Sequence, residues 1–141
     1  MREIKFRAWQ KNYKEMYQPF CGYLELGEAG IETIGFEDGD LCLRNSDVIV
    51  MQYTGQKDYK KIEIYEGDII QFTEVDEDSC MGAEETHIVS VEWISDISQW
   101  MCIFQSGRRI DLRCITNFGC IKECDVIGNI YENPELLTKE K

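Results

Sequence analysis

Three cysteines near the end of the chain are the residues whose types and spacing most resemble a chemical site. Cys114, Cys120 and Cys124 fall within one short stretch, and thiolates are common ligands of structural zinc. Their spacing, C-x5-C-x3-C, is not one of the usual zinc patterns, and His87 is the only histidine of the chain. We therefore favour small, buried thiols, with zinc as the alternative, and expect no cofactor.

Two acidic stretches could also do chemistry. His87 follows Glu84 and Glu85 closely enough for a base beside carboxylates, but no nucleophile or second histidine accompanies it. We expect His87 to mark the boundary between a loop and a strand. Residues 37–40, Glu-Asp-Gly-Asp, have the acidity of a calcium loop without its later oxygen ligands, so a solvated turn is expected. No phosphate loop or nucleophile–base pair appears, and the sequence favours a protein that is not an enzyme.

Basic and aromatic residues form two stretches that could bind a partner. The first twenty residues combine five cations with Trp9 and Tyr13, a pattern that fits nucleic-acid binding. The favoured interpretation is the solvated face of an edge hairpin, where lysine also discourages aggregation. Arg108, Arg109 and Arg113 could hold an anion, although neutralising nearby acids is the commoner role of arginine. The candidate interaction surface comprises Arg7, Trp9, Tyr13, Tyr17, Tyr59, Arg108 and Arg109.

Length and composition limit the number of domains, the class of protein and the compartment that can be expected. A chain of 141 residues favours a single domain over residues 1–141. The net charge is −12, and 43% hydrophobic with 11% aromatic residues argues for a folded protein. Seven cysteines, an odd number without a disulfide spacing, indicate free thiols in a reducing cytoplasm. No apolar run approaches the ~20 residues of a membrane span, so we expect a cytoplasmic protein that binds no membrane.

The first half of the chain should form short strands. Apolar residues alternate over 4–9 and return after a polar turn, which predicts a hairpin over residues 3–18. Residues 21–47 are acidic and interrupted by glycines, so short strands and turns are expected there. The apolar run at 48–51 predicts a central strand, and residues 55–61 read as a surface loop.

The second half continues this pattern. Strands are expected on either side of a tight turn at Gly67-Asp68, followed by an acidic loop at about 73–86 that is solvated or binds a cation or a basic partner. Residues 87–94 and 100–105 should form a hairpin with Trp93 on its buried side.

Three features are expected near the C-terminus. The alternation over 110–115 predicts another strand, and residues 125–131 should form the last strand, with Gly128 at a bulge or a close contact. Asn133 and Pro134 then favour a short helical turn. The fold class is mainly β: a compact small barrel or sandwich of short antiparallel strands.

Three blocks of the sequence carry a resemblance to a known family. MREIKFRAW at the start, MQYTGQKDYKKIEIYEGDII in the middle and VIGNIYENPELL near the end occur in this order. Together they resemble the YopX family of small phage and prophage proteins. The resemblance implies one mostly β, YopX-like domain encoded by a mobile element. It implies no activity, cofactor or catalytic residue.

Two non-enzymatic functions fit these observations, and they make different use of the charge. The favoured one is a phage accessory module that binds a host or phage protein, or a second copy of itself, through exposed strands and aromatic residues. Self-association is expected from Trp9, which would stand exposed in a monomer. The alternative is nucleic-acid binding through the Lys/Arg patches, against the repulsion that a net charge of −12 exerts on phosphates.

Overall fold

The structure is a computed structural model that describes residues 3–17, 22–28, 30–36, 42–44, 48–78 and 80–138. Most of these residues lie in antiparallel strands, so the predicted mainly β class is confirmed. Contacts divide the chain into two compact units, Met1–Tyr53 and Thr54–Lys141. The single-domain organisation expected from the length stays a prediction. The acidic turn expected at 37–40 falls outside the described residues.

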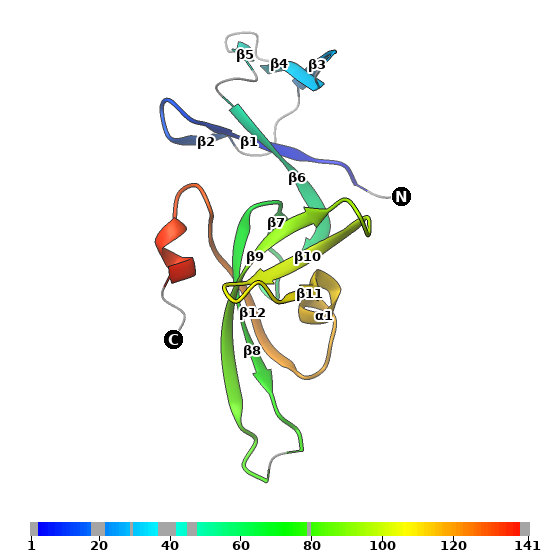
Figure 1. Cartoon of the computed structure of the whole chain (residues 1–141), viewed down its shortest axis with the longest axis vertical. Helices are drawn as coiled ribbons and strands as arrows, with labels where there is room; N and C mark the ends of the chain where they lie inside the picture. The colour runs from blue at the N-terminus through cyan, green and yellow to red at the C-terminus, as the bar shows by residue number, and fades with distance from the viewer. Residues whose placement is uncertain are drawn as a thin grey trace. The chain divides into compact units, whose positions relative to one another are not determined.

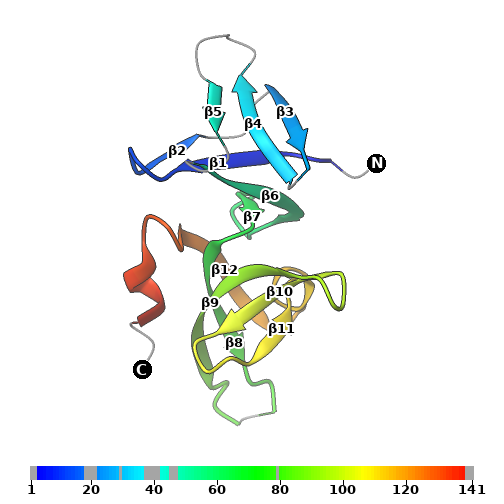
Figure 2. The ribbon, with the colours of Figure 1, turned by 45° about the horizontal axis from the view of Figure 1, so that its top comes forward.

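The first unit consists of short antiparallel strands. β1 pairs on one edge with β2 and on the other with β6, and β3, β4 and β5 form a separate three-stranded sheet (Figure 2). The predicted N-terminal hairpin is therefore confirmed as β1 and β2. β6 continues into the second unit. The bounds are β1 Phe6–Gln10, β2 Glu15–Tyr17, β3 Gly22–Gly27, β4 Gly30–Phe36, β5 Cys42–Arg44 and β6 Val48–Lys57.

β1 is buried along almost its whole length, on both of its faces. Trp9 is only 7% exposed, and Arg7 is buried with its Nη2 3.7 Å from the Sδ of Met51. The expectation that Trp9 would stand exposed in a monomer is therefore wrong. Alternation alone predicted one solvated face, because a sequence pattern does not reveal when the second face of a strand is also covered.

The second unit is built on a five-stranded sheet in the order β11-β10-β9-β8-β12 (Figure 1). The strand order places β12 at one edge of this sheet and β11 at the other. The end of β6 pairs with β7, and Thr54 Oγ1 donates to the carbonyl of Ile64 at 2.8 Å. The bounds are β7 Glu63–Tyr65, β8 Asp68–Val75, β9 Glu84–Ile94, β10 Gln99–Phe104, β11 Arg109–Asp111, α1 Leu112–Thr116, β12 Ile121–Asn129 and η2 Pro134–Thr138.

One hydrophobic core lies within the curled sheet of the second unit. Helix α1 contributes Leu112 and Ile115 to it, and the two free thiols of Cys102 and Cys124 are fully buried in it. The sheet and its helix thus enclose the core as a half-open barrel. The core residues are Ile64, Ile70, Phe72, Val89, Val91, Cys102, Phe104, Leu112, Ile115, Ile121 and Cys124.

The β9–β10 hairpin is confirmed, but Trp93 is not in the core. Val89 and Val91 are fully buried on the same face, whereas Trp93 is 39% exposed. It packs on its cross-strand partner Trp100, with the ring centroids 5.1 Å apart. The prediction failed because β9 runs past the end of the core, so the apolar alternation continues beyond the residues that it covers.

Three further predictions are corrected in the second unit. Residues 112–116 form helix α1 rather than a strand, because the side chain of Asp111 accepts a hydrogen bond from Arg113 N at 2.8 Å and caps the helix. His87 lies inside β9 and not at its boundary, since β9 begins at Glu84. With β8 reaching Val75, the predicted acidic loop at 73–86 is strand at both of its ends.

Gly128 meets the expectation of both a bulge and a close contact. The β12–β8 register shifts between Val126 and Gly128. A Cβ atom added to Gly128 would lie 2.5 Å from Oδ1 and 3.0 Å from Cβ of Asn133. Asn133 directly precedes the predicted C-terminal helical turn, which is the 3-10 helix η2. Among the helices described, none is long and apolar enough to cross a membrane.

Candidate binding groove

The loop between β6 and β7 is organised by one buried carboxylate. Asp58 is buried, and its Oδ1 accepts hydrogen bonds from the backbone N–H groups of Lys60 and Ile62, each at 2.9 Å. Its Oδ2 accepts from Val126 N at 3.0 Å, on β12. Lys61 completes the turn with a φ of +69°, a conformation that non-glycine residues adopt at a cost. Asp58 therefore fixes the loop and attaches it to the sheet.

The same loop covers the outer edge of β12. Tyr59 N donates to the carbonyl of Cys124 at 3.0 Å, and the Tyr59 hydroxyl donates to the carbonyl of Ile121 at 2.9 Å. Partial burial raises the pKa of Tyr59, and Cys124 and Cys120 add to the effect, so the hydroxyl keeps the proton that it donates. Pairing of this kind protects an edge strand from unwanted strand addition.

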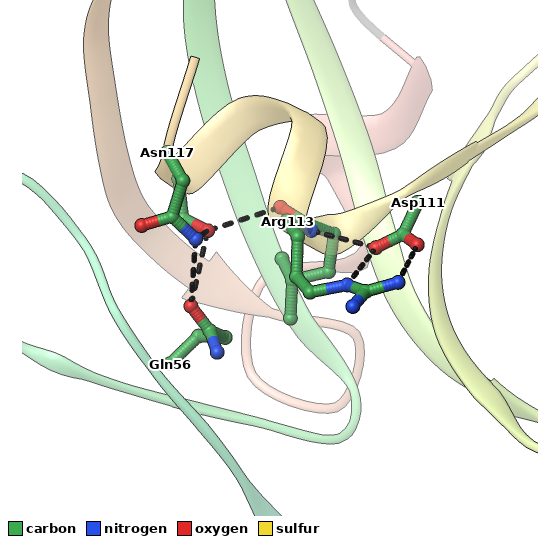
Figure 3. A network of polar contacts seen from close by, with 6 residues as sticks. Gln56, Asp111, Arg113 and Asn117 are labelled. Carbon is green, nitrogen blue, oxygen red and sulfur yellow. Dashed lines mark hydrogen bonds and ion pairs between the residues drawn. The ribbon is translucent and has the colours of Figure 1, made fainter.

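A side-chain bridge ties the end of β6 to the end of helix α1. Gln56 Oε1 accepts hydrogen bonds from Thr116 Oγ1 and Asn117 Nδ2, each at 3.2 Å (Figure 3). At the start of α1, Arg113 Nη2 lies 2.8 Å from Asp111 Oδ2, and this hydrogen bond lowers the pKa of Asp111. The two segments, which are sixty residues apart in sequence, are therefore held at a fixed distance from each other.

These contacts leave a hollow that we call the aromatic groove. Its volume is about 640 Å³, within the range of about 300–1,000 Å³ that is typical of ligand-binding sites. Tyr59 is 40% exposed and Phe118 is 55% exposed at this hollow. The groove is lined by Gly55, Gln56, Lys57, Asp58, Tyr59, Lys61, Thr116, Asn117, Phe118, Gly119 and Ile121.

The aromatic groove is locally cationic, although the chain as a whole is acidic. Lys57 and Lys61 are exposed, and neither forms an ion pair within the part of the chain that the structure describes. The oxygens of Asp58 are occupied by backbone donors. The neighbouring Lys60 instead pairs with Asp125 at 3.3 Å. The groove thus offers two aromatic rings and two ammonium groups to a ligand.

The predicted interaction residues do not form one surface. Arg7 and Trp9 are buried, Tyr17 is half-buried, and Tyr13 is 77% exposed at the turn of the first hairpin. Tyr59 lines the aromatic groove. Arg108 and Arg109 are exposed after the turn at Gly107, and the Arg108 guanidinium lies 5.1 Å from the centre of the Phe104 ring. Of the predicted set, only Tyr59 belongs to the groove.

Cys124 and His87, two of the residues that the sequence suggested for chemistry, are packed in or against the hydrophobic core. Burial raises the pKa of Cys124 to about 12 and raises that of Cys102 further, as expected of thiols packed in a core. Within the described residues, no three His, Cys, Asp or Glu side chains converge as metal ligands. The His87 ring packs against Phe72 and Phe104, with centroids 5.1 and 5.5 Å away.

Comparison with known proteins decides the family. The family model described as YopX protein matches residues 5–138. The chain belongs to the YopX family. Two solved structures share the fold of this YopX protein: protein EF1440 from Enterococcus faecalis, at 24% identity with a TM-score of 0.59, and yopX from Bacillus subtilis, at 18% identity with a TM-score of 0.63. Each alignment covers 97% of this chain and 99% of the other. No curated protein matches the chain.

Sequence reasoning missed most of the groove. Phe118 was not singled out, and Lys57 and Lys61 were read only as part of a solvated loop. A usable signal was present, because three lysines surround Tyr59 in a chain with an excess of acids. Phe118 lies beside that loop because Asn117 hydrogen-bonds to Gln56, and no local sequence pattern reveals a contact between such distant residues.

Proposed function

We propose that this YopX protein is a non-enzymatic protein-binding module of a phage or prophage, and that the aromatic groove is its binding surface. The observation that carries the proposal is the exposure of Tyr59 and Phe118 in one hollow. Exposed aromatic side chains are enriched at protein interfaces, where they bury a large area at a small entropy cost. The walls of the groove are held by hydrogen bonds, so little ordering is needed on binding.

The charge of the groove identifies the class of segment that it binds. Lys57 and Lys61 are available to carboxylates, and the two rings are available to an apolar side chain. The partner is therefore a protein segment that combines acidic residues with an exposed apolar residue. The free, buried thiols of Cys102 and Cys124 support action in a reducing compartment, the cytoplasm of the bacterial host.

Peptide binding measured by fluorescence polarisation tests this function. A labelled peptide with an apolar residue between acids should bind, and its lysine-substituted counterpart should not. Phe118→Ala should weaken binding about tenfold or more, the effect of a residue at the centre of an interface. Ile97→Ala is the matched control, since Ile97 is equally exposed on the β9–β10 turn. Equal affinity for both peptides, or equal effects of both variants, would contradict the proposed function.

Nucleic-acid binding is the second candidate function, favoured by the exposed pair Arg108 and Arg109. Arg108 lies beside the aromatic ring of Phe104, and a cation next to an aromatic ring is a combination that binds single strands. A gel-shift assay at low salt with single- and double-stranded DNA and RNA separates the two candidates. Salt-sensitive binding that weakens in the Arg108→Ala, Arg109→Ala double variant would replace protein binding as the favoured function.

A further inference from the structure

The β8–β9 hairpin carries a second surface, with chemistry opposite to that of the aromatic groove. Six carboxylates border a hollow of about 670 Å³ near the tip of the hairpin. Glu84 pairs with Lys122 Nζ at 2.7 Å, and Glu74 and Glu85 each lie 3.8 Å from Nε2 of His87. Within the described residues, Asp76, Glu77 and Asp78 form no ion pair. Met81, beside this hollow in sequence, is 94% exposed, the highest value among the large hydrophobic residues described. The acids are Glu74, Asp76, Glu77, Asp78, Glu84 and Glu85.

The hairpin tip matches the partner that the groove requires. Met81 is an exposed apolar side chain between acids, and its thioether makes favourable contacts with aromatic rings such as those of Tyr59 and Phe118. The acids complement Lys57 and Lys61. Complementary charges of this kind select partners and fix their orientation more than they add affinity.

The two surfaces are neighbours on the same unit. Cys120 lines the acidic hollow, whereas the adjacent residues Gly119 and Ile121 line the aromatic groove. Val75 N, at the tip end of β8, donates to the carbonyl of Cys120 at 2.8 Å, which attaches the hairpin to this segment close to its tip. When two complementary patches lie side by side on one molecule, a two-fold axis can pair both at once and close a dimer.

We propose that the aromatic groove binds the β8–β9 hairpin of a second copy of this chain, and that the exchange is reciprocal. In this dimer, Met81 of each copy enters the groove of the other, and Glu77 and Asp78 lie against Lys57 and Lys61. The inference rests on the proposed function, because it names the partner of the same groove.

Charge reversal on each surface in turn tests the exchange. The Lys57→Glu, Lys61→Glu variant places acids opposite the acidic hairpin, and the Glu77→Lys, Asp78→Lys variant places lysines opposite the cationic groove. Each variant alone should dimerise about tenfold or more weakly than the unmodified chain. A mixture of the two restores opposite charges at both contacts, so it should give a heterodimer of twice the 16.5 kDa of one chain. Lys60→Glu is the control, because Lys60 does not line the groove.

The masses are measured by analytical ultracentrifugation at micromolar to high micromolar concentration, and circular dichroism checks that each variant is folded. Monomeric single variants with a dimeric mixture support the exchange. An unmodified chain that stays monomeric, or a dimer that neither variant weakens, overturns it. If the groove still binds the acidic peptide while the chain stays monomeric, the proposed function holds and only the identity of the partner is wrong. If neither occurs, both proposals fall.

Discussion

Removal of the Asp58 carboxylate is the most direct test of how the aromatic groove is held. Its three backbone hydrogen bonds fix the loop and reach Val126 on β12. In Asp58→Ala, water can replace the acceptor for Lys60 and Ile62, both of which are exposed, at about 0.5–1.5 kcal/mol each. The half-buried N–H of Val126 loses its partner at a cost of about 1–3 kcal/mol. The expected loss of stability is therefore about 2–6 kcal/mol.

Asp58→Asn separates these contributions. The amide oxygen can still accept from the loop, but its NH2 group would face the N–H of Val126, two donors in contact, which costs about 1–3 kcal/mol. Hydrogen exchange of the Val126 amide should accelerate in both variants, and more so in Asp58→Ala.

Urea unfolding provides the measurement. With a slope of about 1.5 kcal/mol per molar urea, a loss of about 3 kcal/mol lowers the midpoint by about 2 M. Asp125→Asn is the control, because it removes only the partly exposed ion pair with Lys60 and should change stability by less than about 1 kcal/mol. Equal midpoints for Asp58→Ala and Asp125→Asn would refute the reasoning.

Three further predictions concern other parts of the chain. Gly128→Ala should destabilise the protein by about 1–3 kcal/mol in urea unfolding, because the new Cβ collides with Asn133. Gly119→Ala is its control and should leave stability unchanged, because its new Cβ meets no atom within 4 Å. Trp9→Ala should cost about 3–5 kcal/mol by the same assay, as for a core tryptophan, whereas a small change would place Trp9 outside the core. Asp111→Ala should cost about 1 kcal/mol as the loss of a helix cap. The hydrogen bond from Arg113 lowers the pKa of Asp111 in the folded state. The charged carboxylate therefore stabilises the fold at pH values above about 4, the pKa of aspartate in the unfolded chain, and this contribution is lost as the pH falls further. Thermal unfolding at several pH values should show that the difference in melting temperature between Asp111→Ala and the unmodified chain becomes smaller below that pH.

Periodicity predicted the strands well, because most of them obey the two-residue repeat. The N-terminal hairpin and the β9–β10 hairpin follow from apolar alternation and from polar turns between the strands. The same rule failed at residues 112–116, where alternation is also compatible with one turn of helix and the cap at Asp111 decides between them. It failed at Trp93 because alternation fixes the face of a strand, and not how far the core extends along it.

The proposed binding surface was less predictable, because it depends on contacts between distant residues. Tyr59 was a candidate from the sequence, but the surface loop expected at 55–61 begins only at Asp58, because β6 runs to Lys57. That Asp58 is buried within the same charged loop could not be read from composition, since only the fold brings Val126 N within 3.0 Å of its carboxylate. Phe118 likewise lies in the same groove as Tyr59 only because the fold brings the end of helix α1 next to the end of β6.

Net charge gives a poor description of what this surface attracts. A charge of −12 predicts repulsion of any acidic partner at long range. At physiological salt, however, exposed charges more than about 8 Å apart are largely screened, so a segment already near the aromatic groove interacts mainly with Lys57 and Lys61. In the proposed complex, the overall charge therefore lowers the association rate of an acidic hairpin, whereas the two lysines and the two rings set its dissociation rate. In the proposed dimer, selectivity follows because the groove offers the hairpin cations and aromatic surface together.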